Sequence, residues 1–164
     1  MMTCAIPTGR LGKQTLELLF NQHVTTTLIG PGRQLQIEDQ TSNLTFLFVK
    51  PSDVITYVTS GLADIGIVGS DLIEETKADI YELLDLNIGK CQMIVAGLNE
   101  KAYLENDHLV VSTKFKNTAK SYFKTRNQTV EIKHLNGSVE LAPLIALSDV
   151  IVDITETGTT LKEN

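Results

Sequence analysis

Short runs of apolar residues alternate with amphipathic stretches along the chain. The apolar runs predict strands at residues 3–6, 35–38, 44–49, 65–68, 81–86, 92–97, 109–112, 130–134 and 150–154. Apolar residues at helical spacing predict helices at residues 13–23, 53–60, 71–76, 117–126 and 139–147. Five polar residues separate the second strand from the third and favour a hairpin. Strands that alternate with helices in this way predict an α/β fold whose parallel sheets are covered on both faces.

A weak internal repeat links the two halves of the chain. The segment Gly61-Leu62-Ala63-Asp64-Ile65 resembles Ala146-Leu147-Ser148-Asp149-Val150, at an offset of 85 residues. In each segment a predicted helix ends and an apolar strand begins, and Gly61 suits the position just after a helix. Two similar α/β lobes, residues 1–88 and 89–164, would explain the repeat, with a ligand in the cleft between them. Chance similarity between two common helix-to-strand junctions explains it nearly as well.

Composition narrows the class of protein. Of the 164 residues, 42% are hydrophobic and 21% are charged, which is typical of a folded globular chain. The net charge of −6 argues against a basic protein that binds nucleic acid. Residues 1–100 carry 6 basic and 12 acidic side chains, and residues 101–164 carry 8 of each. Any affinity for phosphate must therefore be local.

The cysteines, the histidines and the N-terminus bear on compartment and metal binding. Cys4 and Cys91 both lie in apolar runs, which favours two reduced, buried thiols and a cytoplasmic location. The two cysteines and three scattered histidines match no metal-binding spacing. The sequence contains no signal-peptide pattern and no apolar run near the ~18 residues of a membrane span.

A polar segment follows the last predicted strand and reads DITETGTTL at residues 153–161. Threonine hydroxyls and a glycine at residues 157–160 suit a phosphate dianion, especially where a helix begins. Asp153 and Glu156 suit ribose hydroxyls, or a Mg²⁺ ion shared with a pyrophosphate. Together they are what a phosphorylated sugar diphosphate needs. An ordinary strand-to-helix turn with capping threonines is the alternative.

Two arginines follow predicted turns. Arg10 comes directly after the first strand, at the edge of an α/β sheet where ligands usually bind, and could clamp a di- or triphosphate with both guanidinium nitrogens. Arg33 is presented by the tight turn at residues 30–32. Arg10 could equally be a surface arginine near a helix start, and a turn with a solvated cation is the favoured alternative for Arg33.

Two further candidates lie in the second half. In the turn at residues 136–140, Glu140 could contact a ribose or a base, although Ser138 as a helix cap is a sufficient structural explanation. Residues 114–126 carry five basic side chains and no acidic ones. They form either a solvated helix face or a positive wall that attracts polyphosphates.

Six segments, taken in order, give the chain a resemblance to a known family. They are PTGRL, GRQLQI, KPSDVITYVTSGLADIGIVGSDLIEE, YELLDLNIGKCQMIVAG, NGSVELAPLIALSDVIVDI and DITETGTTL. The chain resembles the short-form catalytic subunit of the ATP phosphoribosyltransferase family over nearly its whole length. The resemblance implies two α/β lobes like those of type II periplasmic binding proteins. It also implies that ATP and 5-phosphoribosyl 1-pyrophosphate condense to N1-(5-phosphoribosyl)-ATP and pyrophosphate, the first step of histidine biosynthesis.

The same resemblance implies roles for individual residues. Asp153 and Arg10 would be catalytic. The residues that would bind phosphoribosyl pyrophosphate are Asp153, Thr155, Glu156, Thr157, Gly158, Thr159 and Thr160. Arg10, Arg33 and Glu140 would contact ATP or pyrophosphate. Mg²⁺ would arrive with the substrate phosphates, without an assigned protein ligand. Many relatives have Lys in place of Thr8 and Arg in place of Lys50, and either change could weaken a phosphate contact.

Partners also follow from the resemblance. Short members depend on a regulatory subunit that resembles histidyl-tRNA synthetase, so we expect a homo- or hetero-oligomer that binds neither nucleic acid nor membrane. Relatives continue beyond the final loop with a strand and a helix that return to the first lobe, and we expect that return to be missing here. The alternatives are a non-catalytic two-lobed protein that binds a small molecule and a scaffold subunit.

Overall fold

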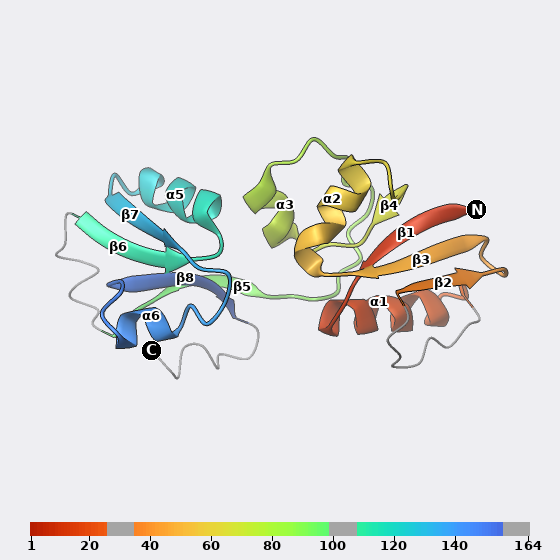
Figure 1. Cartoon of the computed structure of the whole chain (residues 1–164), viewed down its shortest axis with the longest axis horizontal. Coiled ribbons are helices and arrows are strands. Elements are labelled where there is room, and N and C mark those ends of the chain that lie inside the picture. Colours follow the sequence, from red (N-terminus) through yellow and green to blue (C-terminus); the bar gives the residue numbers. More distant parts are fainter. Residues whose placement is uncertain (26–34, 99–107, 156–164) are drawn as a thin grey trace. The chain divides into compact units, whose positions relative to one another are not determined.

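The computed structural model describes residues 1–25, 35–98 and 108–155 (Figure 1). The chain divides into two compact units, unit 1 at Met1–Gly89 and unit 2 at Lys90–Asn164. Each unit contains one four-stranded sheet with helices packed against it.

Unit 1 is built on a sheet with the strand order β2-β3-β1-β4. Its elements are β1 (Met2–Pro7), α1 (Arg10–Asn21), β2 (Gln36–Asp39), β3 (Leu44–Val49), a 3-10 turn (Pro51–Asp53), α2 (Val54–Thr59), β4 (Ile65–Gly66) and α3 (Ser70–Thr76). The central strand β1 runs parallel to β3 and β4. β2 pairs antiparallel with β3 and forms the predicted hairpin.

Unit 2 is built on a sheet with the strand order β5-β8-β6-β7. Its elements are β5 (Gln92–Ala96), β6 (His108–Thr113), α5 (Lys116–Thr125), β7 (Thr129–His134), α6 (Leu141–Leu144) and β8 (Val150–Thr155). β6 runs parallel to β7 and β8, while β5 is antiparallel to β8. Each sheet is therefore mixed rather than wholly parallel, because one edge strand in each unit runs in the opposite direction.

Alternation along the central strands lets each sheet pack on both faces. In unit 1, Cys4 and Ile6 pack with α1, whereas Ala5, between them, packs with Val54 of α2. Successive side chains of a strand point to opposite faces, so one apolar strand supplies two cores.

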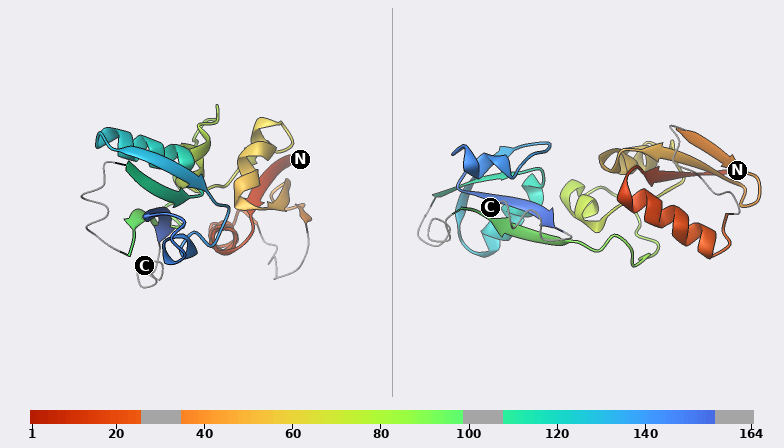
Figure 2. Two further views of the ribbon diagram at one scale, coloured as in Figure 1. Left: turned by 60° about the vertical axis from the view of Figure 1, so that its left-hand side comes forward. Right: turned by 90° about the horizontal axis from the view of Figure 1, so that it is seen from below.

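Unit 2, whose ribbon is drawn from two further sides in Figure 2, follows the same rule. Val150 and Val152 pack with Phe123 of α5. Ile151, between them, packs with Val139 on the opposite face. Both faces of each sheet are thus covered, as the alternating sequence pattern predicts.

The short sequence repeat corresponds to the same local structure in both units. Gly61 and Ala146 each follow a helix with a left-handed backbone, at φ +71° and +56°. The N–H of the next residue, Leu62 or Leu147, donates to the carbonyl oxygen five residues earlier, at 3.0 and 2.9 Å. This is a Schellman motif, which satisfies the last carbonyls of a helix.

The aspartates of the repeat fasten the next strand in the same way. The N–H of Asp64 donates to the carbonyl of Thr3 at 2.9 Å, and the Asp64 carboxylate accepts from the Thr3 N–H at 2.7 Å. Asp149 makes the same two bonds with Val110, at 2.9 and 2.8 Å. The strand order β3-β1-β4 also matches β7-β6-β8. The two units therefore share one folding pattern.

The predicted strand at residues 81–86 is wrong: the segment contains no strand. Tyr81, Leu83 and Leu84 are 93%, 79% and 77% exposed, so these apolar side chains are not buried. A strand requires a neighbour that completes its hydrogen bonds, and no described strand pairs with this segment.

Two further predictions need correction. The helix expected at residues 139–147 is only Leu141–Leu144, because Pro143 offers no N–H and Ala146 adopts the left-handed conformation. Of the two expected buried thiols, only Cys4 is buried and Cys91 is exposed. Burial raises the pKa of the Cys4 thiol to about 11 because the thiolate would lose its hydration.

Candidate functional site

The carboxyl ends of the parallel strands in unit 2 meet at one edge of the sheet. Thr113 of β6 lies opposite His134 of β7 and Val152 of β8. Asp153 follows Val152, and β8 continues to Thr155. This is the edge at which open α/β sheets bind their ligands.

Asp153 is held in place at this edge but is not saturated with hydrogen bonds. Its side chain is 18% exposed, and its Oδ1 atom is buried without a hydrogen-bond partner among the described residues. The Nζ atom of Lys114 lies 3.9 Å from that oxygen. A buried carboxylate oxygen without a hydrogen-bond partner is unusual in a folded protein and marks a place where a ligand, an ion or water would complete its bonding. Thr155 lies two residues further along β8, so it shares a face of the strand with Asp153.

The hydroxyl of Thr113 ties the two strand ends together. It donates to the carbonyl oxygen of Val152 at 2.6 Å and accepts from the N–H of Phe115 at 2.8 Å. Thr113 and Phe115 are both fully buried. The backbone on either side of Lys114 is thereby fixed beside Asp153.

Glu140 lies in the same unit, half-buried, immediately before α6. Ser138 does not cap that helix with its side chain. It has a left-handed backbone, at φ +49°, and its carbonyl accepts from the N–H of Leu141 at 3.2 Å. The turn after β7 thus places Glu140, rather than Ser138, at the start of the helix. α6 itself contacts β8.

In unit 1, Arg10 is the first residue of α1, and only Thr8 and Gly9 separate it from β1. Gly9 precedes it with φ +89° and ψ −152°, a conformation that favours glycine. Lys50 is exposed directly after β3, and the Thr8 N–H donates to the Val49 carbonyl at 2.7 Å. Two cationic residues therefore follow adjacent parallel strands of unit 1.

The site residues predicted from sequence divide accordingly. Asp153, Thr155 and Glu140 belong to unit 2, and Arg10 belongs to unit 1. The remaining ones lie outside the described residues: Arg33, Glu156, Thr157, Gly158, Thr159 and Thr160. The predicted site omitted Lys50 and Lys114. Both are the first residue after a parallel strand, a position that could have identified them.

Comparison with known proteins gives a single result. A model of the family described as ATP phosphoribosyltransferase matches residues 50–164. An ATP phosphoribosyltransferase of Caldicellulosiruptor bescii is 51% identical over all of this chain and 80% of its own length. One from Clostridioides difficile is 46% identical over 99% of this chain and 79% of its own length.

The chain belongs to the ATP phosphoribosyltransferase family. The resemblance drawn from the sequence motifs is therefore confirmed. Among solved structures, the chain is similar to the ATP phosphoribosyl transferase (HisG:HisZ) complex from Thermotoga maritima, with a TM-score of 0.82 and 35% identity. That match covers 99% of this chain and 78% of the other. The predicted two-lobed α/β fold is thus the fold of the family.

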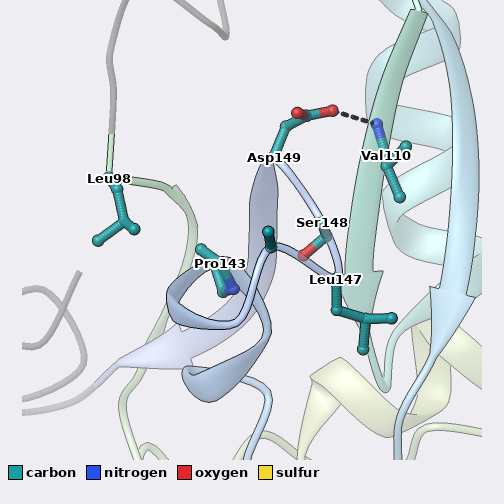
Figure 3. Close-up of a pocket in the computed structure, with 7 residues that line it drawn as sticks. Leu98, Val110, Pro143, Leu147, Ser148 and Asp149 are labelled. Atoms are coloured by element: carbon teal, nitrogen blue, oxygen red, sulfur yellow. Dashed lines mark hydrogen bonds between the residues drawn. The ribbon is translucent and has the colours of Figure 1, made fainter.

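Unit 2 also contains a cavity that lies away from the candidate site. It measures about 290 Å³ and is lined mainly by apolar groups, with the Asp149 carboxylate bonded to the Val110 N–H at its rim (Figure 3). Asp149 precedes β8 and Val110 is near the start of β6, so the cavity is at the opposite edge of the sheet from Asp153.

The described residues also bear on metal binding and on membrane insertion. No group of three or more His, Cys, Asp or Glu residues is placed there to hold a metal ion. Mg²⁺ is commonly bound by one or two carboxylates together with substrate phosphates, and the unsaturated Asp153 carboxylate fits that chemistry. No helix in the described ranges has the length and apolar character that crossing a bilayer requires.

Proposed function

We propose that this chain transfers the phosphoribosyl group of 5-phosphoribosyl 1-pyrophosphate to N1 of the adenine of ATP. The products are N1-(5-phosphoribosyl)-ATP and pyrophosphate, in the first step of histidine biosynthesis. The observation that carries the proposal is Asp153, an unsaturated carboxylate at the ligand edge of unit 2. It lies three residues before the first residue of the segment ETGTTL, in a chain that belongs to the ATP phosphoribosyltransferase family.

The chemistry asks for binding groups more than for a protein nucleophile. Adenine N1 attacks the anomeric carbon, and the bond from that carbon to the pyrophosphate oxygen breaks. The sugar gains oxocarbenium character, which a nearby carboxylate stabilises. In the proposed site Asp153 accepts from the ribose hydroxyls, and residues 157–160 hold the 5-phosphate.

The other end of the reaction carries negative charge that must be neutralised. Mg²⁺ bound to the pyrophosphate, with Asp153 as the described carboxylate that fits it, would lower the charge of the leaving group. Arg10 and Lys50, after adjacent strands of unit 1, suit the phosphates of ATP or pyrophosphate, and Arg33 and Glu140 are each proposed as a further contact to ATP or pyrophosphate. Most of the rate enhancement then comes from positioning two anionic substrates.

A regulatory subunit is part of this proposal. One solved structure to which the chain is similar is a HisG:HisZ complex, which supports assembly with a partner subunit. The net charge of −6 argues against nucleic acid as a partner, so phosphate binding must depend on local cationic residues. The buried Cys4 thiol, which forms no disulfide, supports a reducing cytoplasmic location.

The test is turnover of ATP and phosphoribosyl pyrophosphate, with Mg²⁺ and the regulatory subunit supplied. We expect Arg10→Ala to lower kcat/KM about 100-fold, the loss expected when charge-assisted hydrogen bonds worth ~3 kcal/mol are removed. Lys77→Asn is the matched control, because it removes a cation at the end of α3 and asparagine tolerates the left-handed backbone there.

Other outcomes of these experiments would favour an alternative function or a structural role for Arg10. A wild-type complex that assembles but forms no product would contradict the proposal and favour a scaffold subunit. Binding of an amino acid without binding of phosphoribosyl pyrophosphate would favour a two-lobed binding protein. Loss of the folded state in Arg10→Ala would mean that Arg10 is structural, because an exposed cation contributes little to stability.

A further inference from the structure

Lys114 and Asp153 lie at the same level of two adjacent strands. Thr113 of β6 is paired with Val152 of β8, so the next residues of the two parallel strands are Lys114 and Asp153. The distance of 3.9 Å between Nζ and Oδ1 is within the range of an ion pair but too long for a hydrogen bond. Oδ1 accepts no hydrogen bond from the described residues. The carboxylate is therefore faced by a cation, and its Oδ1 atom has no hydrogen-bond donor among the described residues.

Lys114 is fixed at both ends. Its backbone lies between Thr113, whose hydroxyl bonds to the Val152 carbonyl, and Phe115, whose N–H bonds to that hydroxyl. Its ammonium lies 4.7 Å from the centroid of the Phe115 ring, a cation–π contact with a fully buried ring. The long, flexible Lys114 side chain is thus held next to the Asp153 carboxylate by its fixed backbone and by its contact with the Phe115 ring.

The negative charge of the proposed substrate explains why a cation held beside Asp153 is useful. Phosphoribosyl pyrophosphate is a polyanion, and a carboxylate in its binding site repels it. A cation beside the carboxylate offsets that repulsion and leaves the carboxylate oxygens able to accept from ribose hydroxyls. The Lys114 side chain is 38% exposed, so it can act on a ligand at this edge.

We propose that Lys114 is a positioning residue for Asp153: it orients the carboxylate and offsets its charge, so that the edge of unit 2 accepts an anionic sugar phosphate. The inference rests on the proposed function, because it concerns the same substrate.

Unit 2 contains a matched control for this pair. Lys133 forms an ion pair with Glu131 of the same strand, and the two side chains are 42% and 47% exposed. Like Lys114, Lys133 is partly exposed and faces a carboxylate, but its pair lies along β7 rather than at the end of β8. Removing its charge changes the net charge of the unit equally.

The experiment is calorimetric titration of the full chain with phosphoribosyl pyrophosphate and Mg²⁺. Methionine keeps the length of the lysine side chain and its contact with the ring while it removes the charge. We expect Lys114→Met to raise Kd about tenfold or more, and Lys133→Met to raise it less than about twofold. Lys114→Arg restores the charge and should recover most of the affinity, which a purely structural role of the lysine stem would not require.

A double-mutant cycle separates action through Asp153 from independent binding. If Lys114 acts through Asp153, Lys114→Met adds little to the loss that Asp153→Asn causes alone. Additive losses would overturn the positioning role, as would equal affinities of Lys114→Met and Lys133→Met. If Lys114→Met does not fold, as judged by its Tm without ligand, Lys114→Gln takes its place in the same cycle.

Failure of this inference is distinguishable from failure of the proposed function. A wild-type chain that does not bind phosphoribosyl pyrophosphate contradicts the proposed function and the role of Lys114 together. A wild-type chain that binds it, with Lys114→Met unaffected, overturns the role of Lys114 alone.

Discussion

Units 1 and 2 have the same frame but different chemistry at its edge. Each has a central strand between two parallel neighbours, a Schellman motif and an aspartate that fastens the next strand. At the carboxyl edge, unit 1 presents Arg10 and Lys50, whereas unit 2 presents Asp153 beside Lys114. The shared residues account for folding, and the residues that differ account for the proposed division of labour between phosphate and sugar.

The largest effect on stability should come where the helix packing of the two units differs. The third residue of α1 is Gly12, and the third residue of α5 is Thr118. A Cβ atom on Gly12 would lie 1.9 Å from the carbonyl oxygen of Pro7. We expect Gly12→Ala to lower the free energy of unfolding by ~3 kcal/mol in urea denaturation, because the helix must move off the strand. Gly137→Ala is the control, since no atom lies within 4 Å of its Cβ position. Equal stability of the two variants would contradict this close packing.

The next largest effect on stability compares Asp64 with Asp149, the two aspartates of the sequence repeat. The bond from the Val110 N–H to Asp149 is partly buried, and the bond from the Thr3 N–H to Asp64 is exposed. Replacing each aspartate by alanine leaves a backbone N–H without its acceptor. We expect a loss of ~2 kcal/mol for Asp149→Ala and ~1 kcal/mol for Asp64→Ala, because water can replace the exposed acceptor. Hydrogen exchange at the amides of Val110 and Thr3 measures each site directly. A larger loss at Asp64 would break the comparison.

A smaller effect comes from exchanging the residues that follow the two repeated helices. Gly61 has φ +71° and Ala146 has φ +56°, and only glycine adopts this region without strain. We therefore expect Gly61→Ala to lower the free energy of unfolding by ~1 kcal/mol and Ala146→Gly to raise it by up to ~1 kcal/mol. The sign of the change should reverse between the units. Two changes of the same sign would show that the two motifs are not equivalent.

The smallest predicted effect is the difference between the two thiols in their reaction with a thiol reagent. Burial raises the pKa of Cys4 to about 11, from 9.0 for an ordinary thiol, whereas Cys91 is exposed. A thiol reagent at pH 8 should therefore modify Cys91 in the folded chain and Cys4 only after denaturation. Because the unfolded thiol ionises at a lower pH than the folded one, the contribution of Cys4 to stability is full below pH 9 and is lost as the pH rises through about 11. Equal rates of modification would contradict the burial of Cys4.

Much of this fold follows from the sequence pattern. The hairpin, the alternation of strands and helices, and the place of Gly61 all depend on local signals that the residues carry themselves. Asp153 and Arg10 could be predicted as candidate site residues for a related reason. Each is next to the carboxyl end of an apolar strand, where a sheet presents side chains to a ligand.

Other features depend on contacts that no local pattern contains. Residues 81–86 are as apolar as a strand, but no described strand is placed to pair with them. The exposure of Cys91 and the direction of the edge strands depend on tertiary packing. The ion pair of Lys114 with Asp153 joins residues that are close only because β6 and β8 are neighbours, so the sequence shows a basic stretch but not its acidic partner.

The most direct test of the account is the stabilisation of the chain by phosphoribosyl pyrophosphate with Mg²⁺. It is measured as the difference between the free energies of unfolding with and without ligand. At a ligand concentration about 100 times Kd, the wild type should gain ~2.7 kcal/mol. Asp153→Ala should lose most of that gain while it remains folded without ligand. Equal stabilisation of Asp153→Ala and wild type, or no stabilisation of either, would contradict a sugar-phosphate site at the edge of unit 2.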